Sequence, residues 1–537
     1  MSAVLSTTAP ATMKISDLQT GFRILSRLPL ANSRQAQCEI NHFLDSLLQS
    51  PPPGDVYLQL LEQTRISLCF IEEQLAREYT SKALPLGDAE EAAFQQVVAT
   101  WLKASRAYAH CARLQRTDDE DDDAADRLAL ILHRCIYYTG MAISEYHRAR
   151  RQLPRGMWLN LHGFYASAEE WGVATLAVPD SLDPLGRSTH CTAAFASQLL
   201  TELAGPYSLS VQQLGIVRRW ASNWAPLLTV HPVAPGESLP PTVVDLMEDA
   251  GLRPAAACLQ TENIRRIDSA RLAMQINQTR RQLQQKITPS QLGLGEDCSA
   301  SQCQQLLKRL ARPWSLLRAA RQFRRHPGAG MARVCAGFTG VHYIISGKEF
   351  SQPESARIYS REEFDSLFTF RYTLDPTQQL EVRQTQLGFA VDDWEVLDES
   401  ANGFRLLRST AGRRLVPEQL LSICPHDGNA HLLAQVVWLM QEQGGGLIAG
   451  ISALPGRPQA VAARPLAREA GRPEPYSRAF MLPAVAAIGA PQSLVIPQGW
   501  FYSGRLLEIY VNGVWRVKLD RVIGSGADFD RVSFSVT

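Results

Sequence analysis

The stretch "WEVLDESANGFRLL" holds an acid, a hydroxyl and a glycine at fixed offsets, namely Asp398, Ser400 and Gly403. Side chains two positions apart on an extended chain point to the same side, so the carboxylate and the hydroxyl can face one ligand. Together they can accept hydrogen bonds from a planar donor edge such as the N1–H and N2–H₂ of guanine. A glycine three positions further on lets the backbone come close or take a positive φ. The same residues also suit an ordinary polar turn, in which Asp and Ser side chains bond their own backbone.

A pair of arginines supplies the complementary chemistry. Arg321 and Arg325, in "RQFRR", lie just before the strand-like run "ARVCAGFTGVHYII". Guanidinium groups can bind phosphate bidentately, reach guanine O6 and N7, or stack on a base plane. Other arginine pairs share the four-residue spacing, and Arg357/Arg361 is the rival because it lies nearer to Asp398. We favour Arg321 and Arg325 because a predicted strand follows them directly.

These residues resemble the two signatures of PilZ domains, which are small six-stranded β-barrels that bind cyclic diguanylate in bacteria. Asp398, Ser400 and Gly403 match [D/N]-x-S-x-x-G, and Arg321 with Arg325 match R-x-x-x-R in the linker before the first strand. The later segments "LVPEQLLSI" and "LAQVVWLMQEQGGGLIAGISAL" are also similar to that family. The resemblance covers roughly residues 321–465. It implies that the arginines bind phosphate and guanine edges, that Asp398 and Ser400 hold a guanine, and that Gly403 permits close approach.

One departure from the family keeps a second interpretation open. Arg325 and Asp398 are 73 positions apart, which is longer than PilZ domains usually have, so we expect an insertion at about 347–387. The alternative function is therefore a non-binding adaptor or scaffold protein whose barrels keep the PilZ fold without the ligand.

The periodicity of the chain predicts a multidomain fold with an all-α N-terminal half followed by β structure. In "INHFLDSLLQS", apolar residues recur at i, i+3, i+4, i+7 and i+8, as on one helix face. Beyond His326 the period changes to two, and Asn512-Gly513 predicts a tight hairpin turn near the C-terminus. The expected domains are a helical domain (1–150), a second helical block that ends in a basic linker helix (151–325), a PilZ-like barrel (326–466) and a small barrel-like β unit (476–537). Whether the two helical blocks form one domain stays open.

Composition narrows the class of function. The chain has 54 basic and 53 acidic side chains, so no global field draws it to nucleic acid or to a membrane surface. Ten cysteines without a C-x-x-C pair, and the absence of a secretory signal pattern, favour a reducing cytoplasmic setting. No Walker, G-x-S-x-G or H-E-x-x-H motif is present, so we expect neither an enzyme nor a metal or cofactor site. The prediction is a cytoplasmic bacterial signalling receptor for cyclic di-GMP, whose helical half binds an unidentified protein partner or forms a homo-oligomer.

Overall fold

The computed structural model of the chain describes residues 15–115, 123–183, 185–234, 236–317, 323–353, 391–409, 411–466 and 474–537. It contains two compact units. The first comprises residues 1–82 and 86–320, and the second comprises residues 83–85 and 321–537. Both predicted helical blocks therefore belong to one unit.

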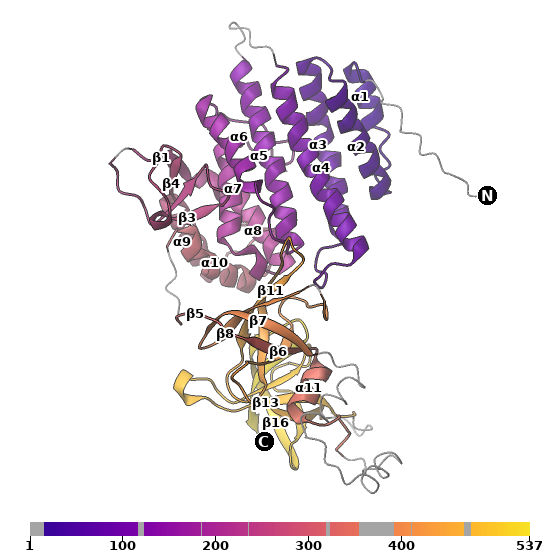
Figure 1. Cartoon of the computed structure of the whole chain (residues 1–537), viewed down its shortest axis with the longest axis vertical. Helices are drawn as coiled ribbons and strands as arrows, with labels where there is room; N and C mark the ends of the chain where they lie inside the picture. The colour runs from indigo at the N-terminus through magenta and orange to yellow at the C-terminus, as the bar shows by residue number, and fades with distance from the viewer. Residues whose placement is uncertain are drawn as a thin grey trace, which may run out of the picture. The chain divides into compact units, whose positions relative to one another are not determined.

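The first unit is built mainly from ten α-helices within its described residues (Figure 1). They are α1 (Leu18–Leu25), α2 (Ser33–Gln49), α3 (Gly54–Ala76), α4 (Asp88–Ala112), α5 (Ala124–Arg148), α6 (Met157–Glu170), α7 (Cys191–Leu203), α8 (Val211–Trp224), α9 (Ala270–Gln284) and α10 (Ala300–Trp314). The apolar stripe read from Ile40 to Leu47 lies in α2 and is buried, as its helical spacing predicts.

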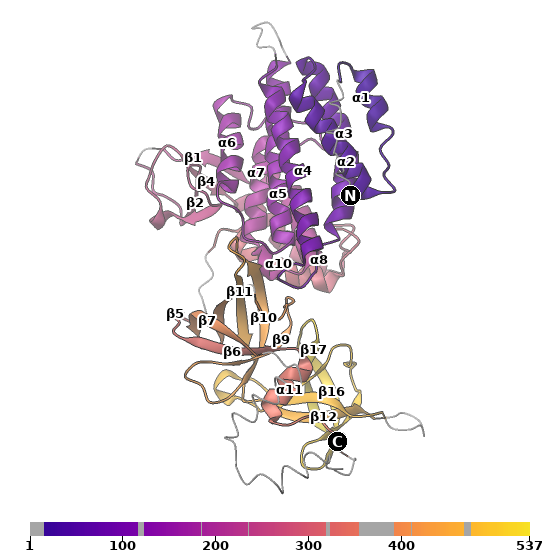
Figure 2. The same ribbon diagram turned by 45° about the vertical axis from the view of Figure 1, so that its right-hand side comes forward.

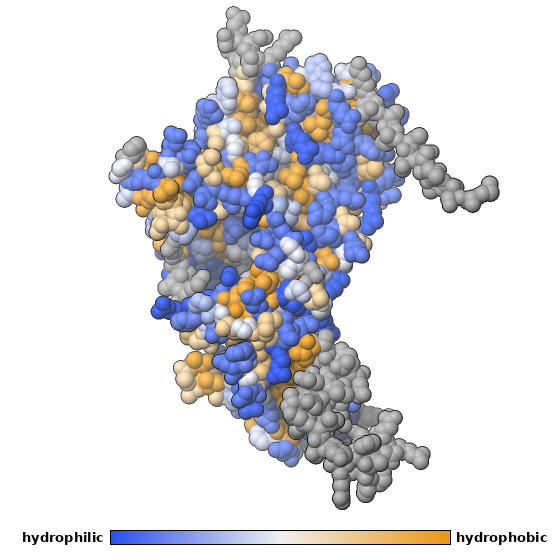
Figure 3. All heavy atoms as spheres, viewed as in Figure 1, coloured by the Kyte–Doolittle hydropathy of each residue, from blue (hydrophilic) through white to orange (hydrophobic). Residues whose placement is uncertain are grey.

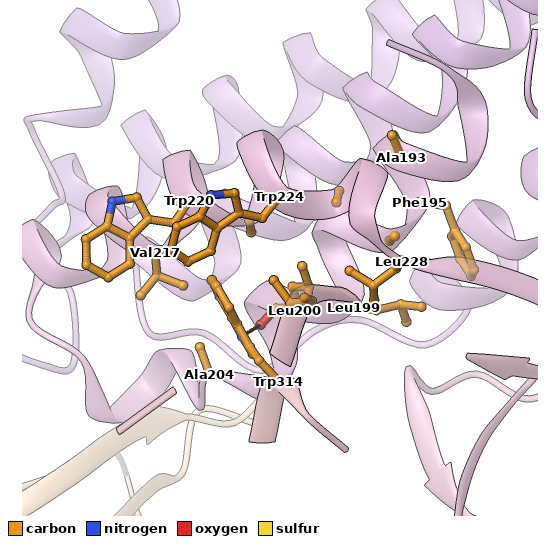
Figure 4. Close-up of a cluster of buried hydrophobic side chains, with 14 of the residues drawn as sticks. Ala193, Phe195, Leu199, Leu200, Ala204, Val217, Trp220, Trp224, Leu228 and Trp314 are labelled. Carbon is orange, nitrogen blue, oxygen red and sulfur yellow. Dashed lines mark hydrogen bonds between the residues drawn. The ribbon is translucent and has the colours of Figure 1, made fainter. Parts of the chain in front are cut away.

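Helix α5 explains why the two helical blocks form one unit. Figure 2 shows it running beside α4, and it also contacts α6 and α7. Its side chains enter two hydrophobic cores, with Ile131 and Tyr138 in the core of α1–α4 and Leu132 and Ile136 in the core of α6–α10. In the second core Trp220 stacks on Trp224, which meets Trp314 edge to face (Figure 4). The Trp314 indole N–H donates to the Leu200 carbonyl at 2.8 Å.

The prediction that residues 151–325 are helical throughout was wrong in two places. Between α8 and α9 the chain forms a four-stranded sheet, in the order β1-β4-β2-β3. Its strands are β1 (Thr229–Pro232), β2 (Thr242–Asp245), β3 (Leu252–Pro254) and β4 (Ile264–Asp268). These strands span only three to five residues each, too few for an alternation of polar and apolar residues to be recognised.

The second error concerns the basic helix, which was expected to continue to Pro327. Helix α10 ends at Trp314, and Leu316 takes a left-handed φ of 55°. The Leu317 N–H donates to the Arg312 carbonyl at 3.1 Å and the Leu316 N–H to the Pro313 carbonyl at 3.0 Å. This is a Schellman termination, which usually uses glycine and is therefore hard to predict at a leucine.

The second unit contains two β-barrels, of which the first holds the predicted site. Its strands are β5 (His326–Pro327), β6 (Met331–Ala336), β7 (Val391–Ser400), β8 (Gly403–Arg408), β9 (Leu420–Cys424), β10 (Leu432–Gln441) and β11 (Leu447–Ala453). They pair in the order β5-β7-β6-β9-β10-β11-β8, and an additional β7–β8 pairing closes a ring of six strands, leaving β5 as an extra strand on β7. The predicted hairpin around Gly444–Gly446 is β10–β11. We call this ring the middle barrel.

The run "ARVCAGFTGVHYII" is not one strand, as was predicted. Strand β6 ends at Ala336, Gly337 has a φ of 90°, and helix α11 (Phe338–Ser346) follows. Short apolar runs do not distinguish a strand from a buried helix, and here the glycine permits the change of backbone direction. The expected insertion falls largely on residues 354–390, which lie outside the described residues.

The second barrel starts earlier than the predicted residue 476. It is a closed ring in the order β12-β13-β14-β17-β16-β15. The strands are β12 (Gln459–Pro465), β13 (Ser477–Leu482), β14 (Ser493–Pro497), β15 (Leu506–Tyr510), β16 (Val514–Ser525) and β17 (Phe529–Val536). Residues 459–465, which looked like a proline-rich linker, are thus its first strand, with Pro465 at the strand end where a missing N–H is tolerated. The predicted hairpin near the C-terminus is β15–β16. Because Tyr510 pairs with Val514, its turn holds three residues, Val511, Asn512 and Gly513, rather than the two expected.

A shared core joins the two barrels. Val341 of α11, Leu420 and Leu433 of the middle barrel pack against Phe480 and Phe529 of the C-terminal barrel. At this junction the His342 imidazole contacts the Val461 carbonyl at 3.2 Å, and the Leu420 N–H donates to the Asp528 carboxylate at 2.8 Å. The apolar area buried in this shared core, with the hydrogen bonds that cross it, makes the two barrels one compact unit.

Three further observations concern the surface, the helices and possible metal sites. On the face shown in Figure 3, apolar residues over the helical half are dispersed among hydrophilic ones. Within the described residues, no helix combines the length and the apolar character that crossing a bilayer requires. That part of the chain also brings no three His, Cys, Asp or Glu side chains into a cluster able to hold a metal ion.

Candidate ligand-binding site on the middle barrel

Strand β7 carries the acid and the hydroxyl on the outer face of the middle barrel because of a bulge. Trp394 and Val396 are buried, and an uninterrupted strand would place Asp398 on their side. The register with β8 shifts between Val396 and Asp398, so Leu397 is an extra residue and the side-chain alternation changes phase. Asp398 then faces outward, opposite Arg405.

Asp398 lies between two arginines from flanking strands. Arg325, immediately before β5, makes an ion pair with Oδ1 of Asp398, and the Nε of Arg405 on β8 is 2.8 Å from Oδ2. Strand β5 pairs with β7 through Pro327 and Asp398, which fixes the place of Arg325 at this edge. The side chains of Arg325, Asp398 and Arg405 are 33%, 18% and 45% exposed, so the cluster remains open to solvent.

Ser400 and Gly403 close the β7–β8 hairpin around the two turn residues Ala401 and Asn402. The Ser400 hydroxyl donates to the Gly403 carbonyl and to the Asn402 side chain, both at 3.2 Å. Position 403 requires glycine because a Cβ there would lie 2.5 Å from the Ile451 carbonyl oxygen on β11. The glycine therefore serves a close approach of two backbones rather than a positive φ.

The structure thus brings together four of the five predicted site residues. Arg325, Asp398, Ser400 and Gly403 lie at the same end of the β5–β7–β8 sheet. Arg321 lies outside the described residues, as do Arg357 and Arg361 of the rival pair. The role of these three arginines stays a prediction.

Sequence reasoning missed Arg405. It lies two positions after Gly403 on a strand, so period-two alternation already places both on the same face. Its neighbours Phe404 and Leu406 are buried, which confirms that Arg405 faces out. The outward orientation of Arg405 could therefore be predicted from "GFRLL". The pairing of Arg405 with Asp398 could not, because it depends on the bulge at Leu397.

The cluster is equipped to bind a planar anionic ligand. A carboxylate that already accepts two guanidinium groups has the geometry to accept two parallel N–H donors from a base edge. Arginines next to it can bind phosphate oxygens with short charge-assisted hydrogen bonds. Because the ion pairs with Asp398 are partly exposed, each is worth only about 0–1 kcal/mol and can be exchanged for ligand contacts.

Comparison with protein families finds three matches along the chain. Residues 22–235 match the N-terminal domain of the cyclic-di-GMP receptor FimW, residues 243–366 match its middle PilZ domain, and residues 461–537 match its C-terminal β-barrel domain. The last match agrees with the C-terminal barrel that begins at β12. The middle match starts in the small sheet of the first unit and ends before β7, so it includes Arg325 but not Asp398–Gly403.

A bacterial receptor aligns over nearly the whole chain. The cyclic-di-GMP receptor FimW of Pseudomonas aeruginosa PAO1 is 24% identical over 550 residues, covering 95% of this chain and 89% of the relative. No solved structure matches. The matches follow the order of the chain, and the six-stranded middle barrel carries the acid–hydroxyl–glycine signature. The chain is therefore a PilZ-domain protein with the N-terminal, middle PilZ and C-terminal β-barrel domains of FimW.

Proposed function

We propose that this chain is a cyclic di-GMP receptor that binds its ligand on the outer face of the middle barrel. The observation that carries the proposal is the convergence of Arg325 and Arg405 on Asp398 beside Ser400, in a chain related to a receptor of that name. The role is binding rather than catalysis. We further infer a cytoplasmic location and a signalling output through the helical unit, by contact with a protein partner or a second copy.

Binding would proceed by exchange of partners at Asp398. The guanine N1–H and N2–H₂ replace the Arg325 guanidinium on the carboxylate, while the released Arg325 turns to a phosphate of the ligand. Ser400 adds a hydrogen bond at the same edge. Arg405 stays beside Asp398 and holds the carboxylate in place through its Nε.

The movement of Arg325 from Asp398 to a ligand phosphate would also couple ligand binding to signalling. Arg325 stands at the end of the segment that leaves α10 and enters β5. Fixing Arg325 on a phosphate restrains this connecting segment, together with Arg321 if the pair acts jointly. The ligand therefore changes the contacts of Arg325 at the point where the chain enters the middle barrel.

Isothermal titration calorimetry of the full chain with cyclic di-GMP tests the proposal. We expect wild type to bind, and Arg325→Ala to bind about 10- to 100-fold more weakly because charge-assisted contacts to phosphate are lost. Arg464→Ala is the matched control, since Arg464 also pairs with an outer-face acid, Glu508, but on the C-terminal barrel.

Two results would count against the receptor. Absence of heat with wild type, when a PilZ control protein binds under the same conditions, would favour the adaptor interpretation. An affinity that Arg325→Ala and Arg464→Ala lower equally would show that the ligand does not bind at this cluster.

A further inference from the structure

The first unit contains a cavity of about 320 Å³, which we call the helical cavity. Helices α5, α7 and α8 form most of its walls, and α7 packs against both of the others. His133, Tyr137 and Met141 of α5 line it, and their four-residue spacing places them on one face of that helix. Cavities that hold small molecules have volumes of about 300 to 1,000 Å³, so this one is large enough for a small ligand.

Small residues on the other two helices keep this space open. Ala194 and Ser197 of α7 and Gly215 of α8 line the cavity. A Cβ on Gly215 would meet no atom within 4 Å, so neighbouring side chains do not fill the space beside it. Small residues alone do not indicate a ligand, but two polar side chains of the cavity do.

The first of these is His133, which is only 2% exposed. Arg134 Nη1 donates to its Nδ1 at 3.0 Å, because a guanidinium can only donate. Burial, and then the charges of Arg134, Arg65 and His190, lower the pKa of His133 well below 6.5, so the imidazole is neutral and carries its proton on Nε2. Among the described residues this Nε2–H has no acceptor. A ligand acceptor in the cavity would satisfy it.

The second is Arg218 of α8, a half-buried cation that no carboxylate balances in the described part of the chain. Its Nη2 donates to the Met141 Sδ at 3.1 Å, and a thioether is a weak acceptor. The neighbouring Arg219 differs, since it pairs with Asp297 at 2.5 Å. Arg218 therefore keeps guanidinium donors for another acceptor.

Tyr137 lies close to both polar side chains. Its ring is nearly parallel to the His133 ring, with the two centroids 6.5 Å apart. Burial raises the pKa of the Tyr137 phenol, and the nearby charges of Arg65 and Arg218 act against that rise. The imidazole and the Arg218 guanidinium thus lie on either side of one aromatic residue in the same cavity.

The other charges around the cavity cancel in pairs. Arg134 pairs with Glu62 at 2.8 Å and Arg65 with Asp180 at 3.0 Å, and both arginine side chains are fully buried. Asp180 lines the cavity, but Arg65 balances its carboxylate. The charge that remains is that of Arg218, so the cavity favours an anion.

We propose that the helical cavity binds a small organic anion, whose carboxylate accepts hydrogen bonds from Arg218 and His133 while its apolar body lies against Tyr137 and Met141. A guanidinium and a neutral imidazole supply N–H donors that suit a carboxylate. Tyr137 and Met141 are partly buried and supply an apolar wall. The inference goes beyond the proposed receptor function, because it gives the helical unit a ligand of its own.

A structural role for the same residues must be distinguished. In that role His133 only accepts from Arg134, and Arg218 only packs against Met141. Such a role gives no binding of anions, and it makes the cavity an ordinary packing defect between helices.

The test uses benzoate as the probe and benzamide as its neutral counterpart of similar shape. Saturation-transfer NMR with the full chain measures the affinity of both. We expect benzoate to bind wild type at least about tenfold more tightly than benzamide, because a charged acceptor makes stronger hydrogen bonds. Arg218→Ala should bind benzoate about tenfold more weakly than wild type. Arg187→Ala removes an arginine that pairs with Asp183 outside the cavity lining, and it should equal wild type.

A second variant closes the cavity without removing a polar group. Gly215→Leu puts a side chain into the open space, and leucine has a higher helix propensity than glycine, so its melting temperature should be no lower than that of wild type. We expect it to bind benzoate at least about tenfold more weakly, since the apolar body is displaced.

Three results would overturn the proposal. They are no binding of benzoate to wild type, equal affinity of wild type, Arg218→Ala and Gly215→Leu for benzoate, and binding of inorganic phosphate as tight as that of benzoate. The last result would show that the cavity does not recognise an apolar body. None of these outcomes depends on whether the chain binds cyclic di-GMP.

Discussion

The two barrels of the second unit each place one acid between two arginines on the outer face, and the two clusters differ in access. In the C-terminal barrel Glu508 of β15 is 2.8 Å from Nη2 of Arg464 on β12 and 3.6 Å from Nε of Arg516 on β16. The side chains of Glu508 and Arg464 are only 10% and 12% exposed, and Arg464 lies over the Tyr476 ring at 4.2 Å. This cluster is packed into the barrel wall.

In the middle barrel the corresponding acid is held more loosely. One arginine, Arg325, comes from the connecting segment rather than from a barrel strand, and a serine and a glycine stand beside the acid. Both arginines there are at least one-third exposed. The comparison teaches that an acid flanked by arginines becomes a ligand site only when one donor can leave and the surrounding backbone is accessible.

The largest difference between the two clusters is expected when the acid of each, Asp398 or Glu508, is removed. Asp398→Ala should reduce the affinity for cyclic di-GMP at least about 100-fold, because the guanine loses both acceptors and two arginines lose their counter-ion. Glu508→Ala should leave the affinity within about threefold of wild type. It should instead lower the midpoint of thermal unfolding, since it leaves Arg464 largely buried without its carboxylate, which costs about 2 kcal/mol or more. Calorimetric titration and thermal melts separate the two effects, and a ligand defect in Glu508→Ala would contradict the assignment.

The hairpin glycines of the two barrels should also differ. Gly403→Ala puts a Cβ 2.5 Å from the Ile451 carbonyl oxygen, so backbone must move at a cost of about 1–3 kcal/mol. Gly513→Ala, at the tip of β15–β16, meets no atom within 4 Å and should cost less than about 0.5 kcal/mol. Denaturant unfolding of the full chain compares them. Equal destabilisation would show that the close approach at Gly403 does not constrain the middle barrel.

The junction of the barrels contains a histidine, His342 of α11, whose burial predicts that stability depends on pH. Burial lowers the pKa of His342 to about 4, below its ordinary 6.5. Between pH 6.5 and 4 the His342 imidazole binds a proton in the unfolded chain but stays neutral in the folded chain. The contribution of this group to stability is therefore complete above about pH 6.5 and is lost as the pH falls toward 4. The loss approaches about 1.4 kcal/mol per pH unit.

Replacement of the histidine tests this linkage. His342 packs among Phe350 and Phe480, so His342→Phe should fit by size. Its unfolding midpoint should vary less between pH 7 and 5 than that of wild type. An unchanged pH dependence would show that this histidine is not the linked group.

The smallest effect is expected at the serine. Ser400→Ala removes a hydroxyl that bonds the hairpin turn at 3.2 Å and that would add one contact to the ligand. We expect a three- to tenfold loss of affinity and a stability loss of about 1 kcal/mol or less. Ser503→Ala on the C-terminal barrel, whose hydroxyl bonds the Asp520 carbonyl, is the control. A loss as large as that of Asp398→Ala would mean that the hydroxyl, not the acid, is the main anchor.

Residue patterns predicted the parts of the fold that follow long regular periods. Sequence patterns predicted helix α2, the hairpins β10–β11 and β15–β16, and the β7–β8 turn with Ser400 and Gly403. The short strands β1–β4, the apolar helix α11 and the left-handed Leu316 were not, because each depends on tertiary contacts rather than on local preference. Within the site, Asp398 and Arg325 were predicted from their chemistry together with the resemblance to the PilZ signatures. The pairing of Arg405 with Asp398 depends on the bulge at Leu397, which resets the strand register and leaves no mark in a single sequence.

The central claim is that the Asp398 carboxylate recognises the donor edge of guanine. The most direct measurement is a calorimetric comparison of cyclic di-GMP with cyclic di-AMP on the full-length wild-type protein. Guanine offers two adjacent N–H donors to a carboxylate, whereas the adenine edge pairs a donor with an acceptor that the carboxylate repels. We predict a preference for cyclic di-GMP of about 100-fold or more. Equal affinity for the two dinucleotides, or affinity for neither, would contradict the account.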